Sequence, residues 1–349
     1  MRKNRRVPAD ASSSDRSAAV IGAGSWGTTF AKVLADGGSE VRLWARRPEV
    51  AAGIARTGRN EHYLPGVELE GVAATAELAE ALEGVDQVYL AIPSQALREN
   101  LRGFAGLGIQ VPEQVIVVSL MKGVEQNTRH RMSEVIAQEL RLPEERIAVV
   151  SGPNLSQEIA GEQPTAAVVA SARLATAREV ARAASNRYFH SYVSTDVIGT
   201  ELGGVLKNLI AIAVGIAEGV GYGENTKAAI ITRGLVEISD FAVALGARPK
   251  TLMGLAGLGD LIATCESPLS RNSTAGRLLG QGLSAREVVD QMTQTAEGIG
   301  SVVPVLELAA EHGIDMPIVA QVAAVLAGTL DPRHIAPDLA TSIDEPEVE

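Results

Sequence analysis

A glycine-rich turn with the spacing Gly-x-Gly-x-x-Gly occupies residues 22–27, directly after the apolar run 18–21. In a dinucleotide-binding turn the first glycine permits a tight turn, the second lets the backbone approach a pyrophosphate, and the third allows close helix–strand packing. A helix expected after the turn would present its free N–H groups to the phosphates. In a chain with 35 glycines the spacing alone could arise by chance, but a second strand expected at 40–44 completes the required unit. The turn therefore predicts a dinucleotide site that includes Gly22, Gly24 and Gly27.

The residues that follow the second expected strand bear on which dinucleotide is bound. NAD-selective folds place an acidic residue there to bind the ribose 2′-hydroxyl, whereas arginine accommodates the 2′-phosphate of NADP. This chain has Arg46 and Arg47, nineteen and twenty positions beyond Gly27. A guanidinium group offers a planar, bidentate fork of donors to a phosphate. We therefore expect NADP(H) to be favoured and NAD(H) to be accepted, with solvated loop charges as the alternative reading of the two arginines.

Composition excludes several classes of protein. The chain has 349 residues, enough for two domains, and its 46% hydrophobic and 21% charged content is ordinary for a globular protein. The formal net charge of −11 argues against nucleic-acid binding, which needs clustered cations, but it does not prevent local capture of a phosphorylated metabolite. No apolar run reaches the ~18–20 residues of a membrane-spanning helix, so we expect no transmembrane segment.

The metal- and disulfide-forming residues are few. Cys265 is the single cysteine, which excludes an intrachain disulfide and fits a reducing compartment; we expect it to be structural. The five histidines show no metal-ligand spacing, so we predict no metal site.

Strand-like and helix-like segments alternate through the first half of the chain. Apolar strands are expected at 86–92, 114–120, 147–150, 165–170 and 188–193, in addition to the first two. Such strands separated by helices indicate an α/β fold, a Rossmann-type doubly wound and mostly parallel sheet, with ligands beyond the carboxyl ends of the strands. The sequence then becomes Gly- and Ala-rich and helical, so we expect an all-helical C-terminal domain. The expected domains are a disordered basic leader at 1–16, the dinucleotide-binding domain at 17–195, the helical substrate domain at 196–330, and an acidic, Pro-containing tail at 331–349.

Many short motifs, in order, carry a resemblance that no single one of them would justify. They are GAGSWGT at 22–28, YLPG at 63–66, PSQ at 93–95, KG at 122–123, SGPN at 151–154, ELGGVLKN at 201–208, GLGDL at 257–261, SRN at 270–272 and AEG at 296–298. Over about residues 18–320 the chain resembles the bacterial-type NAD(P)-dependent glycerol-3-phosphate dehydrogenases. The resemblance implies reversible reduction of dihydroxyacetone phosphate to sn-glycerol 3-phosphate, with hydride from NAD(P)H.

The resemblance implies that Lys207 is the catalytic residue, the proton donor in reduction and the acceptor in oxidation. Gly203 and Gly204, at i−4 and i−3, would leave bare backbone on that face of the helix. An ordinary lysine pKa of ~10.4 favours reduction, and a second ammonium nearby would lower the Lys207 pKa. Without the resemblance, Lys207 would be read as a surface lysine. The implied substrate-binding residues are Lys122, Gly152, Asn154, Lys207, Asn208, Asp260, Thr264, Ser270, Arg271 and Asn272.

The same resemblance implies the cofactor contacts. They are Gly22, Gly24, Ser25, Trp26, Gly27, Arg46, Arg47, Tyr63, Pro93, Lys122, Ser156, Arg271 and Glu297. Ser156 stands where the family usually has alanine, so this chain adds a hydroxyl at that position. Asp260 and Thr264 are spaced to share a helix face. Asp260 could also cap a helix after Gly259, which would be compatible with a catalytic role, and Ser270 or Asn272 is expected to cap another.

Two rival functions remain open at this stage. One is a related dehydrogenase acting on another hydroxy or amino acid, against which the phosphate-receptor residues argue. The other is a non-catalytic dinucleotide sensor, against which the retained lysines and Asp260 argue. The family further implies a homodimer, a cytoplasmic location and a role in phospholipid synthesis.

Overall fold

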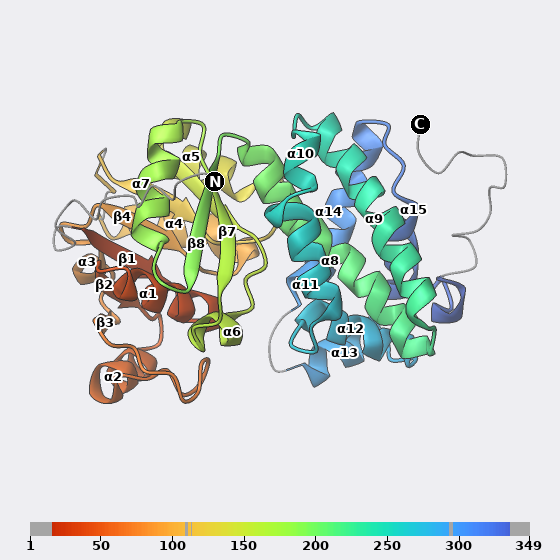
Figure 1. Ribbon diagram of the computed structural model, residues 1–349, viewed down its shortest axis with the longest axis horizontal. Coiled ribbons are helices and arrows are strands. Elements are labelled where there is room, and N and C mark those ends of the chain that lie inside the picture. The colour runs from red at the N-terminus through yellow and green to blue at the C-terminus, as the bar shows by residue number, and fades with distance from the viewer. Residues whose placement is uncertain (1–15, 109–110, 113, 293–295, 336–349) are drawn as a thin grey trace, which may run out of the picture.

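An eight-stranded sheet forms the first half of the molecule (Figure 1). The computed structural model describes residues 16–108, 111–112, 114–292 and 296–335. The strand order is β3-β2-β1-β4-β5-β6-β7-β8, and all neighbours pair in parallel except β6 and β7. The strands are β1 (Ser17–Ile21), β2 (Glu40–Trp44), β3 (Val72–Thr75), β4 (Gln87–Leu90), β5 (Ile116–Ser119), β6 (Ile147–Ser151), β7 (Thr165–Ala170) and β8 (Phe189–Ser194).

Helices cover both faces of the sheet because strand residues alternate between two cores. Ala18 and Val20 of β1 face one core, and Ala19 and Ile21 face the other. The first core includes α1 (Ser25–Asp36), α2 (Pro48–Thr57) and α7 (Leu174–Ala184), and the second includes α3 (Leu78–Leu82), α4 (Leu97–Gly106) and α5 (Met132–Leu140). The sheet domain also contains the short helices η1 (Ser94–Ala96), η2 (Glu144–Arg146) and α6 (Ser156–Ala160). The predicted doubly wound, mostly parallel sheet is therefore confirmed.

The sheet topology brings three predicted motifs to one edge. The chain order reverses between β1 and β4, which is where this type of sheet binds its ligands. Because β4, β5 and β6 are parallel, the residues that follow them, Pro93, Lys122 and Gly152, lie at the same edge. The prediction missed β3, and it did not anticipate that β7 reverses direction against β6.

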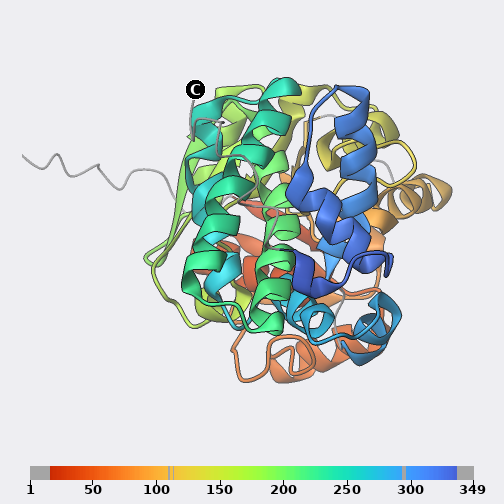
Figure 2. The same ribbon diagram turned by 90° about the vertical axis from the view of Figure 1, so that its right-hand side faces the viewer.

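A long central helix, α8 (Val197–Val220), organises the second half, which is helical throughout its described residues (Figure 2). Asp196 starts it by accepting a hydrogen bond from the Gly199 N–H. Around α8 lie α9 (Glu224–Ala244), α10 (Pro249–Leu252), η3 (Leu255–Gly259), α11 (Asp260–Glu266), α12 (Arg271–Gly280), α13 (Ala285–Gln291), α14 (Glu297–Glu311), α15 (Pro317–Leu326) and η4 (Pro332–His334). By length and composition α8 could cross a membrane, but 89% of its apolar window is buried inside the protein, as in a core helix.

Glycines allow α8 and α12 to touch along their backbones. A Cβ on Gly276 would lie 2.9 Å from the Cα of Gly215, and one on Gly280 would lie 2.9 Å from the Cα of Gly219. The matched spacing shows that the two helices run side by side in the same direction. The N-terminal turn of α12 then brings Asn272 to Asn208 in the middle of α8, where the two side chains form a hydrogen bond of 2.8 Å.

Most of the expected leader and tail lies outside the described residues. Residues 1–15 and 336–349 are not described, so the predictions of a disordered leader at 1–16 and a fraying tail at 331–349 remain predictions.

Candidate active site

The glycine turn has the geometry that each glycine's predicted role requires. Gly22 has a φ of 117°, and a Cβ there would lie 2.4 Å from the carbonyl oxygen of Ala91. A Cβ on Gly27 would lie 1.9 Å from the Gly22 carbonyl oxygen, so only glycine allows α1 to pack this closely. Around Gly24, by contrast, no described atom lies within 4 Å of the Cβ position. This open face at the N-terminus of α1 fits the pyrophosphate of a dinucleotide.

Arg47 is held by Tyr63 beside that turn. The Arg47 guanidinium donates a 3.1 Å hydrogen bond to the Tyr63 hydroxyl and lies 5.5 Å from the centre of its ring. Ser25 in turn donates to the Tyr63 backbone oxygen at 2.8 Å. Arg46 is exposed at the end of β2. The structure thus connects Arg47 to the glycine turn through Tyr63 and Ser25, with Arg46 next to it in the chain.

Three other predicted cofactor contacts surround the turn. Trp26 packs edge-on against Phe30 and donates from its ring nitrogen to the Leu120 carbonyl, two residues before Lys122. Pro93 is exposed after β4. Ser156 begins α6, and its backbone oxygen accepts a 3.3 Å hydrogen bond from Thr29 of α1. Trp26 thus ties the dinucleotide turn to the loop that carries Lys122.

Two lysines from different domains meet on one buried carboxylate. Lys122 Nζ lies 2.5 Å from Oδ2 of Asp260, and Lys207 Nζ lies 3.0 Å from its Oδ1. Lys122 also donates to the Gly152 carbonyl at 2.9 Å. Asp260 is 1% exposed and Lys207 is 7% exposed, so these charges are compensated by one another and not by bulk water.

The glycines before Lys207 let α8 approach its neighbours closely. A Cβ on Gly203 would lie 2.4 Å from the Ala256 carbonyl oxygen, and a Cβ on Gly204 would lie 2.4 Å from Oγ of Ser151 and 3.5 Å from the Lys122 side chain. The expected bare backbone on this face is therefore present. This close approach lets Lys122 of the sheet domain and Lys207 of the helical domain lie in the same site.

Burial sets the protonation of Lys207. Removal from water lowers the Lys207 pKa to about 8; the Asp260 carboxylate opposes the shift, and the Lys122 ammonium adds to it. The predicted direction is confirmed, but burial outweighs the neighbouring ammonium as its cause. Such a pKa lets the group give or take a proton near neutral pH.

Asp260 and Thr264 share one face of α11, as their spacing predicts. Thr264 Oγ1 lies 2.5 Å from Lys207 Nζ and 3.3 Å from Asp260 Oδ1. The N-cap of α11 is Gly259 and Asp260 is the first helical residue, so the alternative prediction that Asp260 caps the helix is wrong. Cys265 is buried beside them, and burial raises its thiol pKa to about 12, as befits a structural cysteine.

Two residues at the end of β6 carry buried polar atoms without partners in the described part of the chain. Both amide atoms of Asn154 and the Ser151 hydroxyl are buried with no hydrogen-bond partner among the described residues. Such groups normally have partners, because an unsatisfied buried polar atom is costly. Ser151 ends β6 and Asn154 follows it, on either side of Gly152, whose carbonyl accepts a hydrogen bond from Lys122. The predictions include Gly152 and Asn154 but miss Ser151.

Two helix N-termini meet at the predicted phosphate end. Ser270 caps α12 by accepting from the Ser273 N–H at 3.2 Å, and Arg271 is exposed at the first helical position. Asn272 binds Asn208 on one side and accepts from the Gly298 N–H at 3.1 Å on the other. The start of α14 therefore lies beside the start of α12. This arrangement offers an anion both helix N–H groups and a guanidinium.

Glu297, the first residue of α14, belongs to the same group of charges. Burial raises its pKa, and the charges of Arg271, Lys122 and Lys207 oppose that rise. Glu297 therefore lies within electrostatic reach of both lysines and the phosphate-receptor arginine. Its sequence context alone would suggest a solvated charge.

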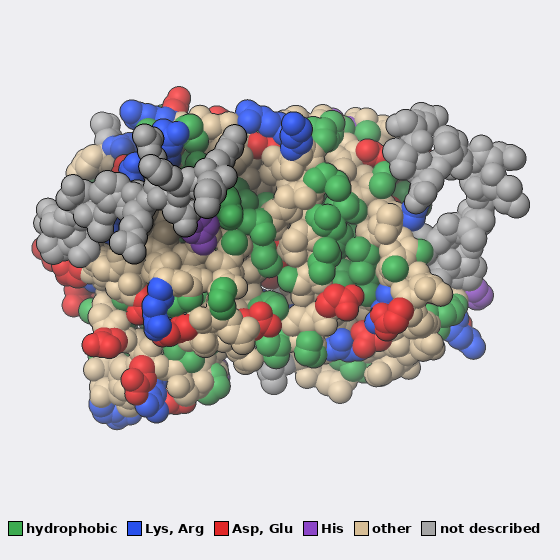
Figure 3. All heavy atoms as spheres, in the orientation of Figure 1, with side chains coloured by type: hydrophobic (Ala, Val, Ile, Leu, Met, Phe, Trp, Pro, Cys, Tyr) green, Lys and Arg blue, Asp and Glu red, His purple; other side chains and the backbone are tan. Residues whose placement is uncertain are grey.

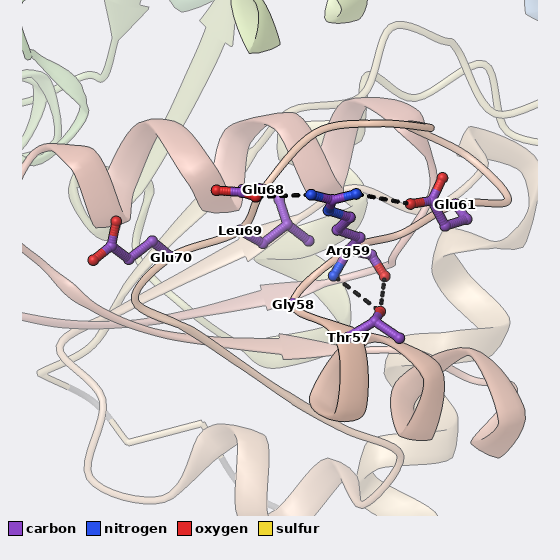
Figure 4. A pocket seen from close by; sticks show the side chains of 7 residues that line it. All are labelled: Thr57, Gly58, Arg59, Glu61, Glu68, Leu69 and Glu70. Atoms are coloured by element: carbon purple, nitrogen blue, oxygen red, sulfur yellow. Dashed lines mark hydrogen bonds and ion pairs between the residues drawn. The ribbon is translucent and has the colours of Figure 1, made fainter.

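A surface depression lies elsewhere and carries no comparable chemistry (Figure 4). It is lined by Thr57 at the end of α2 and by Arg59 and Glu68 in the segment that follows, and Arg59 is already paired with Glu68 at 2.7 Å. Among the residues that the structure describes, no group of three or more His, Cys, Asp or Glu side chains is placed to hold a metal ion.

Comparisons with known proteins agree with this geometry. The family model described as NAD-dependent glycerol-3-phosphate dehydrogenase N-terminus matches residues 17–177, and the corresponding C-terminus model matches residues 196–337. Glycerol-3-phosphate dehydrogenase [NAD(P)+] of Leifsonia xyli subsp. xyli is 64% identical over 95% of this chain and 89% of its own length; that of Streptomyces griseus is 51% identical over 95% and 98%. The crystal structure of glycerol-3-phosphate dehydrogenase from Coxiella burnetii, 36% identical, superposes with a TM-score of 0.87 over 94% of this chain and 99% of that one.

Proposed function

Because this chain belongs to the NAD-dependent glycerol-3-phosphate dehydrogenase family, we propose that it reversibly reduces dihydroxyacetone phosphate to sn-glycerol 3-phosphate with NAD(P)H. The observation that carries the proposal is the pair of ammonium groups on Asp260, one from each domain, beside the unpaired Asn154. Bound NAD(P)H would supply the hydride. The open face of Gly24, the N-terminus of α1 and Arg47 would hold it at the sheet edge.

Lys207 supplies the proton in this proposal. As hydride reaches the carbonyl carbon of the ketone, the carbonyl oxygen takes a proton from Lys207 Nζ, which becomes a neutral amine. In oxidation the neutral amine takes the hydroxyl proton back. Asp260 and Thr264 orient Nζ, and the second ammonium, that of Lys122, stabilises negative charge developing on the oxygen.

The other end of the substrate is held by its phosphate. Arg271 and the N-terminus of α12, capped by Ser270, form the receptor, while Asn272 keeps that turn against Asn208 and α14. The Asn154 amide and the Gly152 backbone orient the substrate hydroxyl and carbonyl groups. Glu297 and Ser156 border the cofactor.

The proposal extends to the preferred cofactor, the cellular location, the pathway and the oligomeric state. We propose that NADPH is preferred because Arg46 and Arg47 lie beside the ribose position. We further propose that the enzyme acts in the cytoplasm, in glycerophospholipid synthesis, a biosynthetic process for which NADPH is a suitable hydride donor. It assembles as a homodimer, as the resemblance implies. Exposed apolar side chains on α9, among them Val236 and Val243, support the dimer, and Figure 3 shows hydrophobic groups gathered over this face of the helical domain.

The direct test is turnover by the purified protein. Protein, NADPH and dihydroxyacetone phosphate are mixed, and loss of nicotinamide absorbance is followed together with formation of glycerol 3-phosphate. Unphosphorylated dihydroxyacetone serves as the control substrate and should react far more slowly. Absence of turnover with both NADPH and NADH would overturn the proposal and favour a non-catalytic dinucleotide sensor.

A further inference from the structure

A buried carboxylate on α8 connects the two domains at a point where the proposed chemistry gives it no role. Glu201 is 6% exposed and lies six residues before Lys207 on the same helix. It accepts hydrogen bonds from the backbone N–H of Ser133 at 2.9 Å, from the Ser133 hydroxyl at 2.5 Å and from the Arg131 guanidinium at 2.7 Å. Every one of these donors belongs to the sheet domain.

Glu201 acts on the beginning of α5. Arg131 is the N-cap of α5, and Ser133 is in its first turn, where N–H groups lack intrahelical partners. A carboxylate at this end of a helix is favoured by the helix dipole as well as by the hydrogen bonds. The α5 helix is fixed to the sheet by buried Met132, Val135 and Ile136. Glu201 therefore fastens α8 to a rigid part of the other domain.

A short, internally bonded segment joins this fastening point to Lys122. Val124 and Arg131 pair as an antiparallel bridge, and the Glu125 N–H donates to the His130 carbonyl at 3.0 Å. The buried Glu125 carboxylate is held by the Arg98 guanidinium at 2.7 and 2.8 Å. The loop between Lys122 and Arg131, the Lys122 loop, is thus held in one closed conformation by these contacts.

Gln95, the last residue of the PSQ motif, lies in η1 and also holds the Lys122 loop in place. Its side chain donates to the Val124 carbonyl at 2.8 Å and accepts from the Gln126 N–H at 3.0 Å. Gly123 also fits closely against Ser94, whose Oγ would lie 2.3 Å from a Cβ at that position. A displacement at Arg131 would therefore be transmitted to Lys122.

We propose that Glu201 is a positioning residue for the reaction: its bonds to Arg131 and Ser133 set the register of α8 against the Lys122 loop. That register places Lys207 and Lys122 on opposite oxygens of Asp260 and next to the hydride-transfer position. A misplacement of about 1 Å in such a site can lower the rate by about a hundredfold. The inference rests on the proposed dehydrogenase reaction.

Glu237 provides a matched control within the same domain. It is also 6% exposed, and it accepts the Ile318 and Val319 N–H groups at 2.9 and 3.0 Å at the start of α15. Both glutamates thus bond the first turn of another helix. Glu201 does so across the domain boundary, whereas Glu237 does so within the helical domain. If Glu201 had a purely structural role, substitution of either glutamate should therefore change kcat and the unfolding midpoint in the same way.

The experiment compares Glu201→Gln, Glu237→Gln and Ser133→Ala in the full chain. Measured are kcat, the KM values, the Kd of NADPH from fluorescence, and the midpoint of urea unfolding. We expect Glu201→Gln to lower kcat by about ten- to a hundredfold, with the NADPH Kd little changed because most of the proposed cofactor contacts lie in the Rossmann domain. Ser133→Ala should lower kcat by a smaller factor, and Glu237→Gln should lower the unfolding midpoint with kcat retained.

Equal kcat in Glu201→Gln and the unsubstituted protein would overturn the positioning role. So would equal losses of kcat in Glu201→Gln and Glu237→Gln. If Glu201→Gln does not fold, an unchanged kcat in folded Ser133→Ala overturns the proposal, and a lowered kcat supports it. Failure of the unsubstituted protein to turn over would instead reject the dehydrogenase reaction itself.

Discussion

Oδ1 of Asp260 lies 3.0 Å from Nζ of Lys207, inside a site where both side chains are almost fully buried. The contact favours the ammonium form of Lys207, whereas burial favours the neutral amine. The balance leaves the Lys207 pKa at about 8. A proton donor and acceptor for a reversible reaction needs both forms to be accessible near neutral pH.

The rates in the two directions should therefore depend oppositely on pH. Reduction needs the ammonium form, so its kcat/KM should be level below pH 8 and fall as the pH rises through about 8. Oxidation needs the neutral amine, so its kcat/KM should rise up to about pH 8 and then level off. Initial rates in both directions from pH 7 to 10 check this. Parallel profiles in the two directions would contradict it.

Replacing Asp260 should move that profile in a known direction. Asp260→Asn removes the carboxylate that favours the ammonium, so the Lys207 pKa should fall and the reduction profile should move to lower pH. The residual activity will also be lower because Lys122 and Lys207 lose their common partner. A shift to higher pH would show that Asp260 does not act on Lys207 in this way.

Two glycines of the turn should separate cofactor binding from folding. Gly27→Ala places a Cβ 1.9 Å from the Gly22 carbonyl oxygen, so it should destabilise the fold by about 1–3 kcal/mol or more. Gly24→Ala meets no described atom within 4 Å and should cost less than about 1 kcal/mol, yet it should raise the cofactor KM. Urea unfolding and steady-state kinetics measure the two effects. A wild-type cofactor KM in Gly24→Ala would refute pyrophosphate binding at this face.

Removing both arginines after β2 should alter the choice of cofactor. The double variant Arg46→Ala/Arg47→Ala loses charge-assisted hydrogen bonds worth about 1.5–3 kcal/mol each, so the NADPH KM should rise by at least about tenfold. The NADH KM should change little. Tyr63→Phe is a milder companion that removes the hydroxyl to which Arg47 donates. Equal effects on both cofactors would exclude recognition of the 2′-phosphate.

Arg271 should matter more to a phosphorylated substrate than to an unphosphorylated one. Arg271→Ala should raise the KM for dihydroxyacetone phosphate by about tenfold or more, since a charge-assisted contact is lost. At saturating NADPH, where the loss of a cofactor contact is offset, the slow rate with unphosphorylated dihydroxyacetone should change little. Arg277→Ala, on the same helix and paired with Glu218, is the matched control. If both substrates respond alike to Arg271→Ala, the phosphate receptor lies elsewhere.

Sequence patterns predicted the parts of this fold that depend on local signals. Local patterns predicted the apolar strands and the glycine turn. They also predicted the helix that carries Asp260 and Thr264, from their i, i+4 spacing, and the helix cap at Ser270. The reversal of β7 against β6 was not predictable in this way, because strand direction depends on the path of the connecting chain and not on the strand residues.

The site itself was predictable only through the resemblance, and its supports were not. Lys122 and Asp260 are 138 residues apart, and no local pattern pairs them. Glu201, Gln95 and Ser151 lie within motifs that carry the resemblance, but nothing in the sequence assigned them a role. Their significance comes from burial and from partners in distant segments, which only the folded chain reveals.

The most direct test of this account is single-turnover reduction by Lys207→Ala. With NADPH and dihydroxyacetone phosphate in place, the variant should react about 10²–10⁴-fold more slowly than the unsubstituted protein, because the proton donor is missing. NADPH binding should survive, and Lys227→Ala, a lysine of α9 paired with Glu224, should react at the normal rate. A Lys207→Ala variant that binds NADPH and reduces the ketone at the unsubstituted rate would contradict the assignment of Lys207 as the proton donor.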